Sequence, residues 1–269
     1  MCELLAMSAK LPTDISFSFA GFASRGGNTG PHKDGFGICF YEGKAVREFK
    51  DFKPSCASPI TQFLQTYQIK STAVIAHIRQ ANVGRISLEN THPFQRELGG
   101  RVWTFAHNGQ MDINVIPAPD YYTPVGETDS EKVFCWLLGE LRKHYQSGDR
   151  MNNHSPLLEE MCNHLNQFGV SNILMSDGHS LFVFCSTKLH WITRRAPFGT
   201  AHLTDADWAI DFSAVTTEED IVTVIATQPL TDNELWSPMK PGESRIFEQG
   251  ESIRQCFGPE IVHKKEADS

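Results

Sequence analysis

The order of the predicted elements places the strongest limit on the fold of this 269-residue chain. Runs of β-branched, aromatic and aliphatic residues predict strands before and after a central region of two consecutive helices. The predicted strands cover residues 3–7, 36–42, 44–49, 72–79, 102–107, 173–176, 181–185, 190–193, 221–226 and 244–247. Strands, then helices, then strands are typical of an α+β domain with antiparallel sheets. We therefore expect one domain over residues 2–258, followed by a charged, flexible tail at residues 259–269.

Start signals define the first of the two central helices. Thr128 is a predicted N-cap, and Glu131 stands three residues later, where a capping box places it. Asp129 adds a negative charge at the positive end of the helix dipole. Apolar residues then recur on one face, as a helix packed on a core requires. The other predicted helices cover residues 15–24, 59–67 and 157–168.

Composition and charge exclude several classes of protein. The net charge is −8, the pI is near 5.8 and no basic stripe is present, so nucleic acid is not an expected partner. The seven cysteines form no C-x-x-C pair and the histidines show no metal-ligand spacing, so we expect no disulfide framework, metal or other cofactor. No apolar stretch is long enough to span a bilayer. We therefore predict a cytoplasmic protein without membrane contact.

Cys2 is the first residue whose position suggests chemistry. If Met1 is removed, Cys2 carries a thiol and a free α-amine on one residue. The ordinary pKa values of these two groups, about 8.5 and about 8, make proton transfer between them nearly thermoneutral. The amine can then act as the base that activates the thiol as a nucleophile. The alternative is a cysteine beside the start codon with no catalytic role.

Three further motifs each allow a structural and a functional interpretation. Arg79, at a strand end, is either a rim arginine with an extended side chain or a fork that binds a carboxylate through two hydrogen bonds. Asn108-Gly109 is either a hairpin turn or a pair of donors, one side-chain amide and one backbone N–H, for an oxyanion. Asp129 either stabilises its helix or holds an ammonium group. Each motif alone is compatible with both interpretations.

Taken together, the motifs resemble those of the class II glutamine amidotransferases, which are N-terminal-nucleophile hydrolases. The resemblance rests on their order and separation along nearly the whole chain, and it is strongest to the small stand-alone bacterial members. The matching segments are Met1-Cys2-Glu3-Leu4-Leu5, His77-Ile78-Arg79, Glu89-Asn90-Thr91-His92-Pro93-Phe94, Ala106-His107-Asn108-Gly109 and Gly126-Glu127-Thr128-Asp129-Ser130-Glu131. Several separated motifs that agree are far more specific than any one of them.

The resemblance implies a fold, a reaction and a set of site residues. The fold would be a four-layer αββα sandwich with two antiparallel sheets. Cys2 would attack the side-chain amide of glutamine and form a γ-glutamyl thioester, giving ammonia and then glutamate. Arg79 would bind the α-carboxylate of the substrate and Asp129 its α-ammonium group. The Asn108 side chain and the Gly109 N–H would stabilise the oxyanion.

Departures from the pattern of the synthase-linked members leave the leaving group of the amide open. Glu3 stands where those members have glycine, Asn82 where they have threonine or serine, and their Arg-Gly-x-Asp loop is not intact after Arg25-Gly26. Glutamine hydrolysis is the first hypothesis, with ammonia used by a separate synthase if one takes part. Hydrolysis of γ-glutamyl peptides or related compounds is the alternative, and an inactive binding subunit is the third.

Overall fold

Fifteen strands and four α-helices make up most of the part of the chain that the computed structural model describes, residues 2–146, 148–259 and 261. The larger sheet has seven strands in the order β13-β9-β12-β1-β4-β2-β3, and every pairing in it is antiparallel. Its strands are β1 (Glu3–Asp14), β2 (Phe36–Glu42), β3 (Ala45–Asp51), β4 (Lys70–Ile78), β9 (His190–Arg195), β12 (Ile221–Ala226) and β13 (Ser237–Pro238).

A second antiparallel sheet has six strands in the order β15-β14-β8-β7-β6-β5. Its strands are β5 (Phe94–Leu98), β6 (Arg101–Met111), β7 (Gly169–Ser176), β8 (Ser180–Cys185), β14 (Glu243–Glu248) and β15 (Glu251–Phe257). A small hairpin of β10 (Thr200–His202) and β11 (Ala209–Asp211) stands apart from both sheets.

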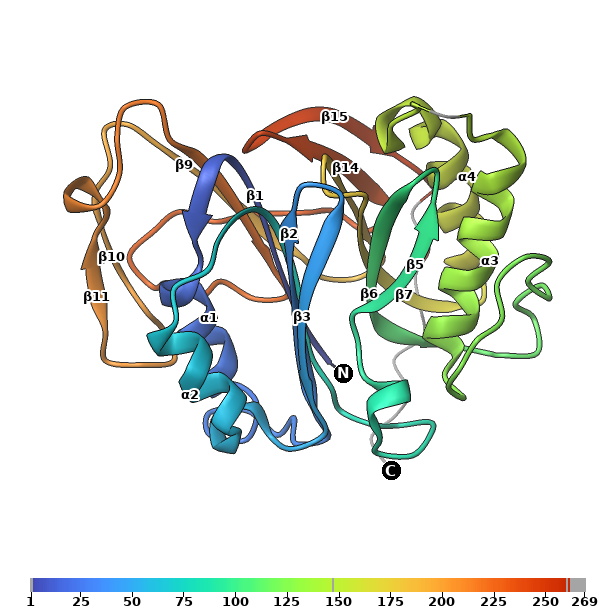
Figure 1. The fold of residues 1–269 in the computed structure, drawn as a ribbon, viewed down its shortest axis with the longest axis horizontal. Helices are drawn as coiled ribbons and strands as arrows, with labels where there is room; N and C mark the ends of the chain where they lie inside the picture. Colours follow the sequence, from blue (N-terminus) through green and yellow to red (C-terminus); the bar gives the residue numbers. More distant parts are fainter. Residues whose placement is uncertain (1, 147, 260, 262–269) are drawn as a thin grey trace.

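Three buried clusters define the layers, since alternate residues of a strand face opposite sides of its sheet. Helices α1 (Ser16–Ser24) and α2 (Pro59–Thr66) pack on the outer face of the seven-stranded sheet. Helices α3 (Asp129–His144) and α4 (Ser155–Leu165) pack on the outer face of the six-stranded sheet. A third cluster, which includes Leu4 of β1 and Ala106 of β6, fills the space between the sheets. The result is the predicted αββα sandwich, with the helix pairs on opposite sides (Figure 1).

The first strand occupies the middle of its sheet. β1 pairs with β12 on one side and with β4 on the other, which places the start of the chain beside the end of β4. Leu4 and Ala6 face the space between the sheets. Cys2 is two residues before Leu4, so its side chain is expected on the same side. The fold therefore directs the Cys2 side chain toward the second sheet.

The structure confirms most predicted elements and corrects several. The hairpin that turns at Gly43 is present, with a positive φ of 64° at this glycine. β6 does not stop before Asn108-Gly109, as predicted, but runs on to Met111, so the hairpin-turn interpretation of this pair is wrong. Thr128 caps α3, but Glu131 accepts its hydrogen bond from the Gly126 N–H rather than completing a capping box.

Other elements differ from the prediction in length or were not predicted. β1 extends to Asp14, beyond the predicted strand, and α4 ends at Leu165, which leaves Phe168 exposed. The edge strands β5, β13 and β15 and the hairpin of β10 and β11 were missed. Of the predicted tail, residues 260 and 262–269 lie outside the described residues.

Candidate active site

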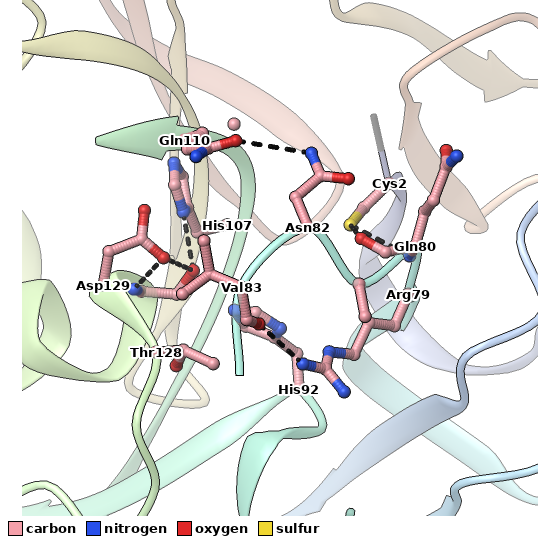
Figure 2. Close-up of a pocket in the computed structure, with 13 residues that line it drawn as sticks. Cys2, Arg79, Gln80, Asn82, Val83, His92, His107, Gln110, Thr128 and Asp129 are labelled. Carbon is pink, nitrogen blue, oxygen red and sulfur yellow. Dashed lines mark hydrogen bonds between the residues drawn. The ribbon is translucent and has the colours of Figure 1, made fainter. Parts of the chain in front are cut away.

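A pocket of about 440 Å³, including its open mouth, lies where the two sheets and the start of α3 meet. Four of the five predicted site residues line it, Cys2, Arg79, Gly109 and Asp129, although they are far apart in sequence. Figure 2 shows Arg79 and Asp129 on opposite sides of this pocket, with Cys2 above Arg79. The fifth residue, Asn108, is next to the pocket but does not line it.

The Cys2 sulfur lies against the backbone of Gln80, just beyond the end of β4. The Gln80 N–H donates to the sulfur at 3.3 Å, and the thiol can donate to the Gln80 carbonyl oxygen at 3.4 Å. Burial raises the pKa of the Cys2 thiol, while the Gln80 N–H and the nearby Arg79 guanidinium lower it. Because burial has the largest effect, the thiol requires a base to become a nucleophile.

Arg79 is the first residue after β4, and only 3% of it is exposed. Its guanidinium donates to the carbonyl oxygens of Arg85 at 2.9 Å and Val83 at 3.0 Å, so it also holds the loop that follows it. Burial lowers the pKa of this guanidinium, and the nearby Cys2 and Asp34 act in the opposite direction. Among the described residues the guanidinium has hydrogen bonds only to carbonyl oxygens and no ion pair, which favours the approach of an anion.

Asp129 begins α3, and its carboxylate is fixed by backbone donors. One oxygen accepts from the Met111 N–H at 2.8 Å and the other from the Ser130 N–H at 2.9 Å. These bonds tie the helix start to the end of β6. Because a carboxylate has about four acceptor positions, Asp129 can still accept hydrogen bonds from a ligand.

The direction of the Gly109 N–H follows from its place in β6. N–H groups of alternate residues in a strand point to the same edge, and the Met111 N–H points to Asp129, away from β7. The Gly109 N–H therefore also points away from β7. β5 pairs with β6 only as far as Phe105, so this edge faces the pocket at Gly109. A Cβ at Gly109 would overlap the Val170 carbonyl oxygen, which explains why glycine is needed here.

Asn108 is 1% exposed, and its side chain shares the face of β6 that carries Ala106. This face looks toward the Cys2 side of the first sheet. The Asn108 Oδ1 has no hydrogen-bond partner among the described residues, which is uncommon for a buried amide. This oxygen can only accept, so it can pair with a donor, whereas the oxyanion role expected of Asn108 would use its Nδ2 N–H.

His107 connects the site to α3. Its Nε2 lies 3.1 Å from the Val170 carbonyl oxygen and its Nδ1 lies 2.8 Å from the Ser130 Oγ. Because a carbonyl oxygen can only accept, the proton is on Nε2, and the Ser130 hydroxyl donates to Nδ1. Burial lowers the pKa of His107, so the neutral tautomer is maintained.

A pair of buried imidazoles, His77 and His92, lies at the pocket, which His92 lines, and the sequence interpretation gave neither a role. The rings of His77 and His92 are 4.1 Å apart, and none of their nitrogens has a hydrogen-bond partner among the described residues. Burial lowers the pKa of His77 to about 3 and that of His92 well below its usual value. The motif around His92 was the available signal, but its contact with His77 depends on the tertiary fold.

Among the described residues, no group of three or more histidine, cysteine, aspartate or glutamate side chains is arranged to hold a metal ion. No helix within those same ranges is long and apolar enough to cross a membrane. All seven cysteines are free thiols.

With this geometry established, comparisons with known proteins identify the family. The chain belongs to the class II glutamine amidotransferases, whose family model matches residues 1–269. It is 58% identical over 254 residues to YafJ of Escherichia coli K12, provisionally named a glutamine amidotransferase; the match covers 94% of this chain and 100% of that protein.

Solved structures agree with this family and fold. A predicted glutamine amidotransferase from Pseudomonas aeruginosa PA01 is 49% identical, with a TM-score of 0.75 over 94% of this chain and 100% of that one. Glutamine phosphoribosylpyrophosphate amidotransferase of Bacillus subtilis is 13% identical, with a TM-score of 0.61 over 95% of this chain and 49% of that one. The second likeness concerns the fold alone, which is that of the N-terminal-nucleophile hydrolases.

Proposed function

We propose that this protein hydrolyses the side-chain amide of glutamine, with Cys2 as the nucleophile. The observation that carries the proposal is the meeting of a thiol, a buried guanidinium, a carboxylate and a backbone N–H in one pocket. A free amino acid presents one anion and one cation at its head and an amide at the other end. Arg79 and Asp129, on opposite sides of the pocket, match the two head-group charges.

The reaction follows from the roles of these groups. The α-amine of Cys2, freed by removal of Met1, takes the thiol proton, and the thiolate attacks the amide carbon. The Gly109 N–H and the Asn108 amide stabilise the oxyanion of the tetrahedral intermediate. The intermediate expels ammonia after the amine returns the proton to the leaving nitrogen. Water then attacks the γ-glutamyl thioester on Cys2 and releases glutamate.

A hydrolase for γ-glutamyl peptides is the second candidate, and the mouth of the pocket favours it. Asn82 and Gln110 line this mouth, and both side chains are exposed. The Asn82 Nδ2 donates to the Gln110 Oε1 at 3.4 Å, as Figure 2 shows. Side-chain amides that open to solvent can pair with the peptide group of a leaving amine, which ammonia lacks.

A substrate panel tests the two candidates directly. Purified protein is offered free glutamine, γ-glutamyl dipeptides and glutathione, and glutamate release is measured for each. Glutamine hydrolysis is supported if kcat/KM is highest for glutamine and is unchanged in Asn82→Ala. A preference for a γ-glutamyl peptide that falls in Asn82→Ala supports the second candidate. Glutamate release from none of these substrates would contradict both.

Intact-mass measurement of the active protein tests the proposed base. The mass should be lower than that of the full sequence by one methionine residue. If the active protein retains Met1, the amine is part of a peptide bond and cannot act as the base.

The proposed setting follows from the same chemistry. The seven free thiols support a reducing compartment such as the cytoplasm. Ammonia released from glutamine would be used by a separate synthase, whereas cleavage of a γ-glutamyl peptide needs no such partner. The substrate panel therefore also decides whether a partner should be sought.

A further inference from the structure

Asn172 of β7 stands directly opposite Asn108 of β6 and is 1% exposed. Its side chain makes five contacts within hydrogen-bond distance, one more than the two donors and two acceptor lone pairs of a carboxamide. Nδ2 donates to the Asn108 carbonyl oxygen at 3.1 Å and to the Thr187 Oγ1 at 2.9 Å. Oδ1 accepts from the backbone N–H groups of Ser186 at 3.0 Å, Thr187 at 3.0 Å and Lys188 at 3.3 Å.

These contacts allow only one orientation of the Asn172 amide. Three N–H groups converge on one of its ends, so that end must be the oxygen, and the nitrogen must face Asn108. The turn that follows β8 supplies all three donors. Asn172 is therefore fixed from outside the pocket, by a part of the chain that does not line it.

The bond to Asn108 acts on the same peptide group that carries the Gly109 N–H. This peptide is trans, since the only cis bonds among the described residues precede Pro93 and Pro197. In a trans peptide the C=O and the N–H point in opposite directions. Holding the Asn108 oxygen toward β7 therefore holds the Gly109 N–H toward the pocket edge.

We propose that Asn172 is a positioning residue that fixes the orientation of the oxyanion-binding N–H of Gly109. The inference rests on the proposed function, because it presumes that an oxyanion forms there. Loss of the Asn172 donor should therefore lower kcat and leave KM nearly unchanged. The ground state of the substrate is bound by Arg79 and Asp129, whereas the oxyanion exists only in the transition state and the intermediate.

Asn172→Asp tests the proposal because it keeps an oxygen for the three backbone donors and removes the two side-chain N–H donors, one to Asn108 and one to Thr187. We expect kcat to fall by roughly 10- to 100-fold, less than the 10²- to 10³-fold typical of deleting an oxyanion donor. KM should stay within about threefold of the wild-type value. Activity is expressed per mole of folded protein, so that unfolded protein does not count as lost turnover.

Thr187→Val is the matched control. It removes the other acceptor of the Asn172 Nδ2 but leaves the bond to Asn108 in place. The proposal predicts near wild-type kcat for this variant. An equal loss of kcat in both variants would show that any damage to this region lowers activity, and would overturn the positioning role.

Alkylation of Cys2 by iodoacetamide, followed by peptide mass spectrometry, separates positioning from general damage. This reaction forms no oxyanion at the amide site, so its rate in Asn172→Asp should match the wild-type rate within about twofold. A parallel fall in alkylation and hydrolysis would contradict the proposal. If Asn172→Asp gives too little folded protein, Asn172→Ala is measured with the same two assays. Its hydrolysis should again fall while its alkylation rate stays near that of the wild type.

The failure of this inference is distinguishable from the failure of the proposed function. If Cys2→Ala retains wild-type hydrolysis, the proposed reaction is wrong. If Cys2→Ala is inactive but Asn172→Asp has wild-type kcat, the reaction stands and only the role of Asn172 is refuted.

Discussion

The two sheets contribute to the site in different ways. The seven-stranded sheet supplies Cys2 and Arg79 from strand ends, one residue before β1 and one residue after β4. The six-stranded sheet supplies Asn108 and Gly109 from inside β6, where the backbone is paired with β7. Groups at strand ends have side chains free to reach a ligand, whereas groups inside a ladder are held in one direction. Under the proposed function, attack and carboxylate binding come from the first sheet, stabilisation of the oxyanion from the second, and ammonium binding from Asp129 at the start of α3.

The largest expected effect comes from the strand end of the first sheet. Cys2→Ala should reduce glutamate release by about 10⁴-fold or more, because no acyl-enzyme can form without the sulfur. The thermal midpoint should hardly change, since Cys2 precedes β1 and is only partly buried. Cys56→Ala, at an exposed cysteine outside the pocket, is the control and should keep full activity. Residual turnover near the wild-type level in Cys2→Ala would show that the first sheet does not supply the nucleophile.

Arg79→Ala should produce the next largest effect, about a 10²- to 10³-fold fall in kcat/KM that appears mainly in KM. Part of this loss comes from the carboxylate contact and part from the loop carbonyls of Val83 and Arg85, which Arg79 also holds. Arg85→Ala is the control, because it keeps the Arg85 carbonyl that Arg79 holds and removes only a side chain that is 76% exposed. Steady-state kinetics should give near wild-type KM for Arg85→Ala. An unchanged KM in Arg79→Ala would refute the binding role.

Asn108→Ala tests the contribution of the second sheet. Loss of one oxyanion donor should lower kcat by about 10²-fold, a change of about 3 kcal/mol in the activation free energy. KM should remain near the wild-type value, in contrast to Arg79→Ala. The opposite pattern, a raised KM with normal kcat, would place Asn108 in ground-state binding and remove the distinction between the two sheets.

The sequence predicted the strand ends of the first sheet better than those of the second, because sequence signals report only local preferences. β4 is a continuous apolar run, so its end at Arg79 is visible in the sequence. Asn-Gly is the strongest short signal for a hairpin, and it led to the wrong prediction that β6 stops at Asn108. The β7 ladder overrides that local preference, since Asn108 and Gly109 pair with Asn172 and Ser171. Pairing between distant strands cannot be read from the turn signal.

The site residues show the same limit. The motifs gave Cys2, Arg79, Gly109 and Asp129, which the structure brings into one pocket. They did not give Asn172, because nothing near it in the sequence marks an asparagine that supports a residue 64 positions away. Glu131 was assigned to the wrong donor because the capping-box pattern ignores the tertiary contact of Arg96 with the same carboxylate. Local patterns identify groups that act directly, while supporting contacts depend on the fold.

The smallest expected effect concerns stability at the junction of the two sheets, where His77 of β4 lies near His107 of β6. Burial, followed by the electrostatic effects of the neighbouring His107 and Arg79, lowers the pKa of His77 from 6.5 to about 3 in the folded protein. Between these two values the unfolded chain binds a proton that the folded chain does not, so the free energy of unfolding falls as the pH decreases from 6.5 toward 3. The slope from this one residue is at most about 1.4 kcal/mol per pH unit.

Urea unfolding at pH 7.5, 6.5, 5.5 and 4.5 measures this slope. His77→Gln should reduce this slope by an amount that corresponds to at most about one proton. This expectation holds even if the substitution changes the stability at neutral pH. His144→Gln, at an exposed position on α3, is the control and should leave the slope unchanged. Equal slopes in the wild type and His77→Gln would mean that His77 takes up its proton in the folded state. The two sheets would then tolerate a charge at their junction, where the His77 and His92 rings are buried against each other.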